Sequence, residues 1–311
     1  MHGHARRTQL LSSPFLDEIA GRRIFVKPEC LQHTGSFKFR GAWSAISTLS
    51  SAARAKGVFA FSSGNHAQGI AAAAKAHGAP AVILMPSDAP RLKIANTKAL
   101  GAEVVTYDRA TEDRDALGAQ MAEDRGLTLI RPFDEPLVIA GQGTIGLEIA
   151  EDAAALGVTE ADVAICCGGG GLTSGIAVAL SAEAPGMVAR PVEPEGFDDV
   201  IRSVAAGEIV SNPRTTGSIC DAIITPAPGH LTFPLIREHC GAGIVVTEDE
   251  ALHAMAHAFE RLKLVVEPGG AVGLAAALFH PGAFTHDTII AVISGGNVDA
   301  PMFARALATL H

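Results

Sequence analysis

The chain has 311 residues, of which 48% are hydrophobic, and a formal net charge of −9. This acidic balance, without a long basic run, argues against nucleic acid or an anionic membrane as the main partner. No stretch of about 18 apolar residues is without charges or glycine clusters, and residues 1–18 lack the apolar core of a secretory signal, so we expect neither a membrane span nor a leader.

Apolar runs that are typical of buried strands alternate with helical stretches along the chain. Strand signals fall at 57–62, 79–86, 103–107, 127–132, 162–167, 189–194 and 288–294, and helix signals at 64–78, 90–101, 111–125, 138–156, 172–184 and 247–263. Continuously apolar strands between helices predict parallel sheets covered on both faces, and the length suits two lobes. Ligands of such sheets bind beyond the carboxyl ends of the strands, so we expect the chemistry in the loops there.

The segment CCGGGGLTSGIA (166–177) leads from a strand through four glycines directly into a helix. Consecutive glycines let backbone N–H groups point into one concavity, and the helix N-terminus adds positive potential, so the segment predicts a phosphate site. Gly169, Gly171 and Gly175, followed by Glu193 at the close of the next strand, also imitate a dinucleotide fingerprint. Because the spacing G-x-G-x-x-x-G is a loose variant, a nicotinamide-dependent oxidoreductase stays a distant alternative.

Three further loops follow strands or precede helices in the same way. FSSGNHAQG (61–69) presents hydroxyls, an amide and an imidazole that suit either a carboxylate ligand or simple helix capping. The loops at 265–278 and 292–300 contain Glu267 and Ser294, and each taken alone is typical of turns.

Lys38 lies in SFKFRGA (36–42), which we interpret as a short constrained turn. A lysine that meets a phosphate site and a carboxylate site indicates pyridoxal phosphate with an amino-acid substrate, because the lysine amine forms a Schiff base with the aldehyde of that cofactor. A dry or cationic surrounding would lower the pKa of this lysine toward that of a usable base.

Seven segments, in order from about residue 8 to about residue 300, resemble the serine/threonine dehydratase and serine racemase family: KPECLQHTGSFKFRGA, SSGNHAQGIAAAA, GQGTIGLEI, CGGGGLTSGIA, VEPEGFDDV, EPGGAVGLAAA and ISGGNVD. The resemblance implies an α/β protein of the tryptophan-synthase-β-like fold (fold type II), a two-domain pyridoxal-phosphate enzyme with parallel-rich sheets flanked by helices. It further implies a large cofactor-binding domain made of residues 1–42 and 139–311, and a small domain at 43–138. The active site would lie in the cleft between them.

The resemblance also assigns roles to individual residues. Lys38 would hold the cofactor and later act as the base, while Phe37 would pack against the cofactor ring and Asn65 would bind the ring oxygen. The other expected cofactor contacts, including a phosphate cradle and a hydroxyl at the pyridine nitrogen, come from Gly168, Gly169, Gly170, Gly171, Leu172, Glu267 and Ser294. The substrate carboxylate would be held by Ser62, Ser63, Gly64, Asn65 and His66.

A cation site and an activity complete these expectations. The resemblance implies magnesium or calcium bound by Glu193, the carbonyl of Phe197 and Asp199, although acids at a helix start also have an ordinary explanation in the helix dipole. The implied function is that of a dehydratase (ammonia-lyase) that converts a β-hydroxy amino acid of the serine, threonine or 3-hydroxyaspartate type into a 2-oxo acid and ammonia. The preferred substrate and its stereochemistry stay open at this point.

Ser63 supports an alternative activity. In racemases of the family a serine at this place lies opposite the lysine, so Lys38 and Ser63 would form the two acid/base groups of a serine or aspartate racemase. The family also favours a homodimer. Five cysteines without a C-x-x-C pair favour the cytoplasm.

Overall fold

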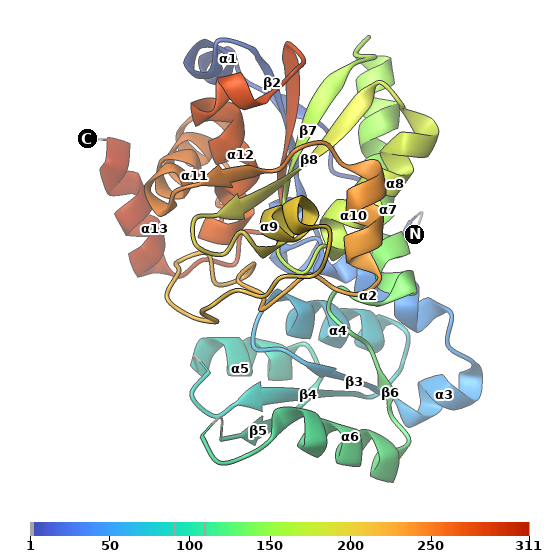
Figure 1. Cartoon of the computed structure of the whole chain (residues 1–311). Helices are drawn as coiled ribbons and strands as arrows, with labels where there is room; N and C mark the ends of the chain where they lie inside the picture. Colours follow the sequence, from blue (N-terminus) through green and yellow to red (C-terminus); the bar gives the residue numbers. More distant parts are fainter. Residues whose placement is uncertain (1–2, 90, 109, 311) are drawn as a thin grey trace.

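Two helix-flanked β-sheets form the frame of the molecule in the computed structural model, which describes residues 3–89, 91–108 and 110–310 (Figure 1). Within these residues the larger sheet has six strands, in the spatial order β1 (Leu11–Ser12), β2 (Arg23–Pro28), β10 (Thr288–Ile293), β7 (Ala161–Cys166), β8 (Met187–Pro194) and β9 (Ile244–Val246). The smaller sheet has four strands, in the order β5 (Glu103–Tyr107), β4 (Ala81–Pro86), β3 (Val58–Phe61) and β6 (Thr128–Leu129).

Parallel pairing dominates both sheets. Among the described strands β1 pairs antiparallel with β2, and the other pairings are parallel. The strands of the smaller sheet all come from one continuous part of the chain, whereas the larger sheet combines both ends of the chain. The expectation of parallel-rich sheets is therefore confirmed.

Helices cover both faces of each sheet (Figure 1). One face of the larger sheet packs against α1 (Pro14–Ala20), α11 (Glu248–Leu262), α12 (Pro268–Phe279) and α13 (Ala300–Leu307), and the other against α7 (Pro136–Ala155) and α8 (Gly171–Glu183). The smaller sheet packs against α2 (Lys38–Ser47), α4 (Asn65–Ala76) and α5 (Arg91–Ala99) on one face and α6 (Arg114–Arg125) on the other. The remaining α-helices of the described residues are α3 (Ser51–Lys56), α9 (Asp199–Ala206) and α10 (Thr232–His239).

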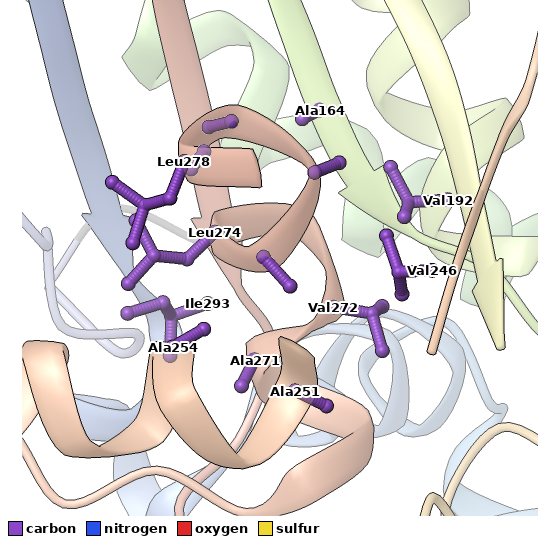
Figure 2. Packing of buried hydrophobic residues seen from close by; sticks show 14 of the residues in the cluster. Ala164, Val192, Val246, Ala251, Ala254, Ala271, Val272, Leu274, Leu278 and Ile293 are labelled. Atoms are coloured by element: carbon purple, nitrogen blue, oxygen red, sulfur yellow. The ribbon is translucent and has the colours of Figure 1, made fainter. Parts of the chain in front are cut away.

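Strand β10 explains why the apolar runs are continuous. Its Ile289 and Ile293 belong to the core on the α12 side, while Ile290 and Val292 belong to the core on the α7–α8 side. Successive side chains of a strand point to opposite faces, so a strand buried on both faces needs apolar residues at every position. Figure 2 shows the first of these cores, in which residues of α12 lie beside residues of β7, β8, β9 and β10.

Several predicted elements differ from the observed ones. SFKFRGA is not a turn, because Lys38 is the first residue of α2. The strand expected at 127–132 shortens to Thr128–Leu129, and residue 90 of the helix expected at 90–101 lies outside the described residues. Strand β2 was missed because charged Lys27 interrupts its apolar run, yet Lys27 is fully buried and paired with Glu148 at 2.7 Å. None of the described helices is long and apolar enough to cross a bilayer.

Candidate active site

A pocket of about 370 Å³ lies where loops of the two sheets meet, in the size range of roughly 300–1,000 Å³ that is usual for small-molecule sites. It opens beyond the carboxyl ends of β3, β7 and β10, as parallel sheets favour. Its walls include the residues expected at the cofactor and at the substrate carboxylate, namely Phe37, Lys38, Ser62, Ser63, Gly64, Asn65, His66, Gly168, Gly169, Gly170, Gly171, Leu172, Glu267 and Ser294.

Lys38 is held at the start of α2 by contacts with the loops that follow β6 and β10. Phe37 N donates to the Ser294 carbonyl oxygen at 3.1 Å, and Lys38 Nζ donates to the Pro132 carbonyl oxygen at 2.8 Å. Burial lowers the pKa of Lys38 to about 8, against the smaller opposing effect of the Glu267 charge. An appreciable fraction of this amine is therefore neutral near neutral pH, which a nucleophile or a general base requires.

The glycine loop turns from β7 into α8 under tight packing. A Cβ atom on Gly169 would lie 2.5 Å from the Phe133 ring, and Gly170 has a φ of 90° that disfavours other residues. The first turn of α8 leaves backbone N–H groups without intrahelical partners. Thr173 lies in this turn and lines the pocket, and its buried hydroxyl oxygen has no partner among the described residues. The loop thus offers donors that suit a phosphate group.

Asn65 is fixed by two residues from distant parts of the chain. Its Nδ2 donates to Glu267 Oε1 at 2.6 Å, and its Oδ1 accepts from Asn297 Nδ2 at 2.7 Å. Asn297 Nδ2 also donates to the Thr34 carbonyl oxygen at 2.8 Å. Burial raises the pKa of Glu267 to about 7, although the hydrogen bond from Asn65 opposes this shift. The Asn65 amide consequently has a defined orientation, with one Nδ2 hydrogen left for a ligand. Sequence reasoning missed Asn297, which lies three residues after Ser294.

His66 differs in kind from the other residues of the SSGNH turn. Its ring is buried, and Nε2 donates to the Ile130 carbonyl oxygen at 3.0 Å. Burial, assisted by the Lys38 charge, lowers the pKa of His66 to about 3. The ring is therefore neutral at physiological pH, and an electrostatic contribution of imidazolium to carboxylate binding is excluded.

The predicted site residues did not include three charged side chains of the pocket wall. Lys93 comes from α5 and Arg114 from α6, and both line the pocket together with Asp221. Lys93 Nζ lies 3.3 Å from Asp221 Oδ2. A signal was present in the sequence, because α5 and α6 follow the parallel strands β4 and β5, whose carboxyl ends face the same edge of the sheet.

The residues expected to bind a cation lie outside the pocket wall, and two of them, Glu193 and Asp199, are close enough for their charges to interact. Glu193 is the penultimate residue of β8 and accepts from two backbone N–H groups of α9, at 3.1 and 2.8 Å. Asp199 Oδ1 accepts from Asn212 Nδ2 at 2.5 Å, and Asp199 Oδ2 has no partner among the described residues. Burial raises the pKa of Asp199 to about 6, and burial together with the Asp199 charge raises the pKa of Glu193 well above its usual range.

Comparison with known proteins identifies the family of the chain. The family model described as Pyridoxal-phosphate dependent enzyme matches residues 1–295. The chain belongs to this family. L-threo-3-hydroxyaspartate ammonia-lyase of Pseudomonas sp is 44% identical, with 99% of this chain and 95% of the relative covered. Serine racemase of Schizosaccharomyces pombe is 41% identical, with 97% and 92% covered. The crystal structure of the T.th. threonine deaminase has a TM-score of 0.89 and 44% identity, with 95% of this chain and 94% of that chain covered.

The family assignment confirms the expected fold type and the pyridoxal-phosphate cofactor, and it replaces the dinucleotide interpretation of the glycine loop. The residues present fit this cofactor. Lys38 offers an amine of lowered pKa, the start of α8 offers N–H groups and the partnerless Thr173 hydroxyl, and Asn65 offers one amide hydrogen. Ser294, which is almost fully buried at the end of β10, offers a neutral hydroxyl.

Proposed function

We propose that this enzyme is an ammonia-lyase that converts a β-hydroxy amino acid into a 2-oxo acid and ammonia. The observation that carries the proposal is one pocket that combines the Lys38 amine, a donor-rich glycine loop and the SSGNH turn. Relatives at 41–44% identity with an ammonia-lyase name or a racemase name support the same class of chemistry. Bound pyridoxal phosphate supplies an electron sink that acidifies the hydrogen on the substrate Cα.

In this proposal each residue has a defined task. Lys38 Nζ takes the proton from the substrate Cα, and the electron pair of the broken bond expels the β-hydroxyl, which takes up a proton and leaves as water. The Pro132 carbonyl accepts a hydrogen bond from the Lys38 ammonium. The hydroxyls and N–H groups of the SSGNH turn bind and orient the substrate carboxylate. Asn65 would bind the ring oxygen of the cofactor with its remaining amide hydrogen, and Ser294 would offer the ring nitrogen a hydroxyl without adding a charge.

The test is release of 2-oxo acid by the purified yellow protein. We would supply L-serine, L-threonine and L-threo-3-hydroxyaspartate in turn, and compare the wild type with Lys38→Ala. The proposal expects rapid release from at least one substrate, and loss of both turnover and yellow colour in the variant. Release from none of them, or turnover that survives in Lys38→Ala, would contradict it.

Racemisation is the second candidate function, and Ser63 is the observation that favours it. Ser63 lines the pocket next to the glycine that precedes α4, within the turn proposed to hold the substrate carboxylate. A hydroxyl across the substrate from Lys38 can return a proton to the opposite face of Cα. Formation of D-serine from L-serine, followed by chiral chromatography, tests this activity independently of 2-oxo acid release.

We also propose a structural magnesium or calcium ion at Glu193, Asp199 and the Phe197 carbonyl. The partnerless oxygen of Asp199 and the raised pKa values of both carboxyl groups support it, because a cation would offset their repulsion. The cation would stabilise the fold here rather than take part in the reaction. Calcium should raise the Tm of the wild type and not that of Asp199→Asn, whereas equal shifts would refute the site.

Three features of the molecule as a whole are further proposals. The two sheets support a small domain at 43–138 and a large domain made of 1–42 and 139–311. A homodimer and a cytoplasmic location follow family precedent and cysteine usage. Light scattering of the purified protein tests the homodimer, and localisation of a tagged chain tests the compartment.

A further inference from the structure

Three charged side chains line the active-site pocket in addition to Lys38 and Glu267. Lys93 and Arg114 reach it from the helices beside the smaller sheet, and Asp221 reaches it from the loop between α9 and α10. The Arg114 guanidinium also lies over the Phe61 ring, 5.2 Å from its centroid. Lys93 thus reaches the pocket wall in contact with Asp221.

A ligand can readily displace Asp221 from its contact with Lys93. The two atoms are 3.3 Å apart, and the side chains are 33% and 62% exposed. Water competes for both groups at such exposure, so a pair of this kind is weakly bound. A carboxylate of a ligand that enters the pocket can therefore take the place of Asp221 beside Lys93 at little cost.

The substrate's orientation decides which of its groups meets Lys93. A substrate bound as proposed above, with its amine at Lys38 and its α-carboxylate at the SSGNH turn, would direct its Cβ substituent to the rest of the wall, which includes Lys93, Arg114 and Asp221. Serine and threonine have no charge there. A 3-hydroxyaspartate-type substrate places a second carboxylate there.

We propose that Lys93 is a specificity-determining residue that binds the second carboxylate of a dicarboxylic β-hydroxy amino acid, and that Asp221 forms an ion pair with Lys93 until such a substrate enters. The inference rests on the proposed ammonia-lyase function and specifies its substrate class. Asp221 also repels dicarboxylates that enter the pocket, so its charge limits their affinity.

The decisive experiment compares kcat/KM of the holoenzyme for L-threo-3-hydroxyaspartate and for L-serine in three variants. Lys93→Met should lower the value for hydroxyaspartate by at least about tenfold and change the value for L-serine by less than about twofold. Asp221→Asn should lower KM for hydroxyaspartate with little change in kcat, because the competing carboxylate is gone. Lys98→Met, a charge removal on the exposed face of the same helix, is the matched control and should change neither value.

A second measurement does not depend on turnover. Succinate, a dicarboxylate without a reactive hydroxyl or amine, should raise the Tm of the wild type and of Lys98→Met, and not that of Lys93→Met. Equal loss of activity on both substrates in Lys93→Met, or no loss on either, would overturn the inference. A wild type that releases 2-oxo acid from L-serine and not from hydroxyaspartate would also overturn it while leaving the proposed function intact.

Discussion

Asn65 Nδ2 donates to Glu267 Oε1 at 2.6 Å, although the two residues are separated by 202 positions in the chain. Asn65 begins α4 beside the smaller sheet, and Glu267 precedes α12 beside the larger sheet. The bond therefore joins the two halves of the molecule inside the active-site pocket. Any shift of one half relative to the other would change the direction of the Asn65 amide.

We first predict that Glu267 sets the cofactor environment through Asn65. Glu267→Ala removes the acceptor, so the amide can rotate, and we expect a shifted absorption maximum of the bound cofactor and a fall of about tenfold or more in kcat. Glu267→Gln keeps an acceptor oxygen and should retain the wild-type absorption maximum. Identical spectra of all three proteins would show that Glu267 does not orient Asn65.

The pH dependence of stability should identify Glu267 as a buried acid. Its pKa is about 7 in the folded protein against 4.5 ordinarily, because burial disfavours the carboxylate. Between these two pH values Glu267 binds more protons in the folded state than in the unfolded state. Protonation of Glu267 therefore stabilises the folded protein at low pH, and this stabilisation is lost as pH rises through about 7.

Glu267→Gln cannot ionise and should remove this dependence. The Tm of the wild type minus that of Glu267→Gln should fall between about pH 5.5 and about pH 8. Differential scanning calorimetry of both holoenzymes over this range measures the difference. A constant difference would mean that Glu267 titrates normally.

Replacement of Ser63 should affect the two proposed activities, racemisation and elimination, to different extents. Ser63→Ala removes the hydroxyl proposed to act opposite Lys38, and we expect racemisation of L-serine to fall by roughly 10²-fold or more while release of 2-oxo acid changes much less. Ser62→Ala, which alters the neighbouring hydroxyl of the same turn, is the control. Parallel losses of both activities in Ser63→Ala would instead indicate a role in substrate binding.

Arg40 should be indispensable for stability. It is fully buried, and its guanidinium contacts Glu29 at 2.8 Å and Glu148 at 2.7 Å. Arg40→Met leaves buried Glu29 without its cationic partner and Glu148 with Lys27 alone, and should lower the free energy of unfolding by about 3–5 kcal/mol. Arg125→Met breaks an exposed pair with Glu103 and should cost at most about 1 kcal/mol. Urea unfolding of the wild type and of the two variants measures both changes in the free energy of unfolding.

The sequence by itself determined the fold class and the parts of the site that are local. Continuous apolar strands between helices predicted parallel sheets, because burial on both faces requires apolar residues at each position. Four glycines between a strand and a helix predicted a phosphate site, since backbone donors at a helix N-terminus need no distant residue. Together with Lys38 these features led to the cofactor that the family assignment confirms.

The tertiary structure alone decided the features that depend on contacts between distant residues. Strand β2 was hidden by Lys27, whose charge is tolerated in the core because Glu148 lies 2.7 Å away, 121 positions along the chain. The orientation of Asn65 depends on Asn297, 232 positions away, and the charged wall of the pocket arises where Lys93 meets Asp221. Local patterns specify strands, helices and loops, but the partner of a buried polar group is set by how those elements pack.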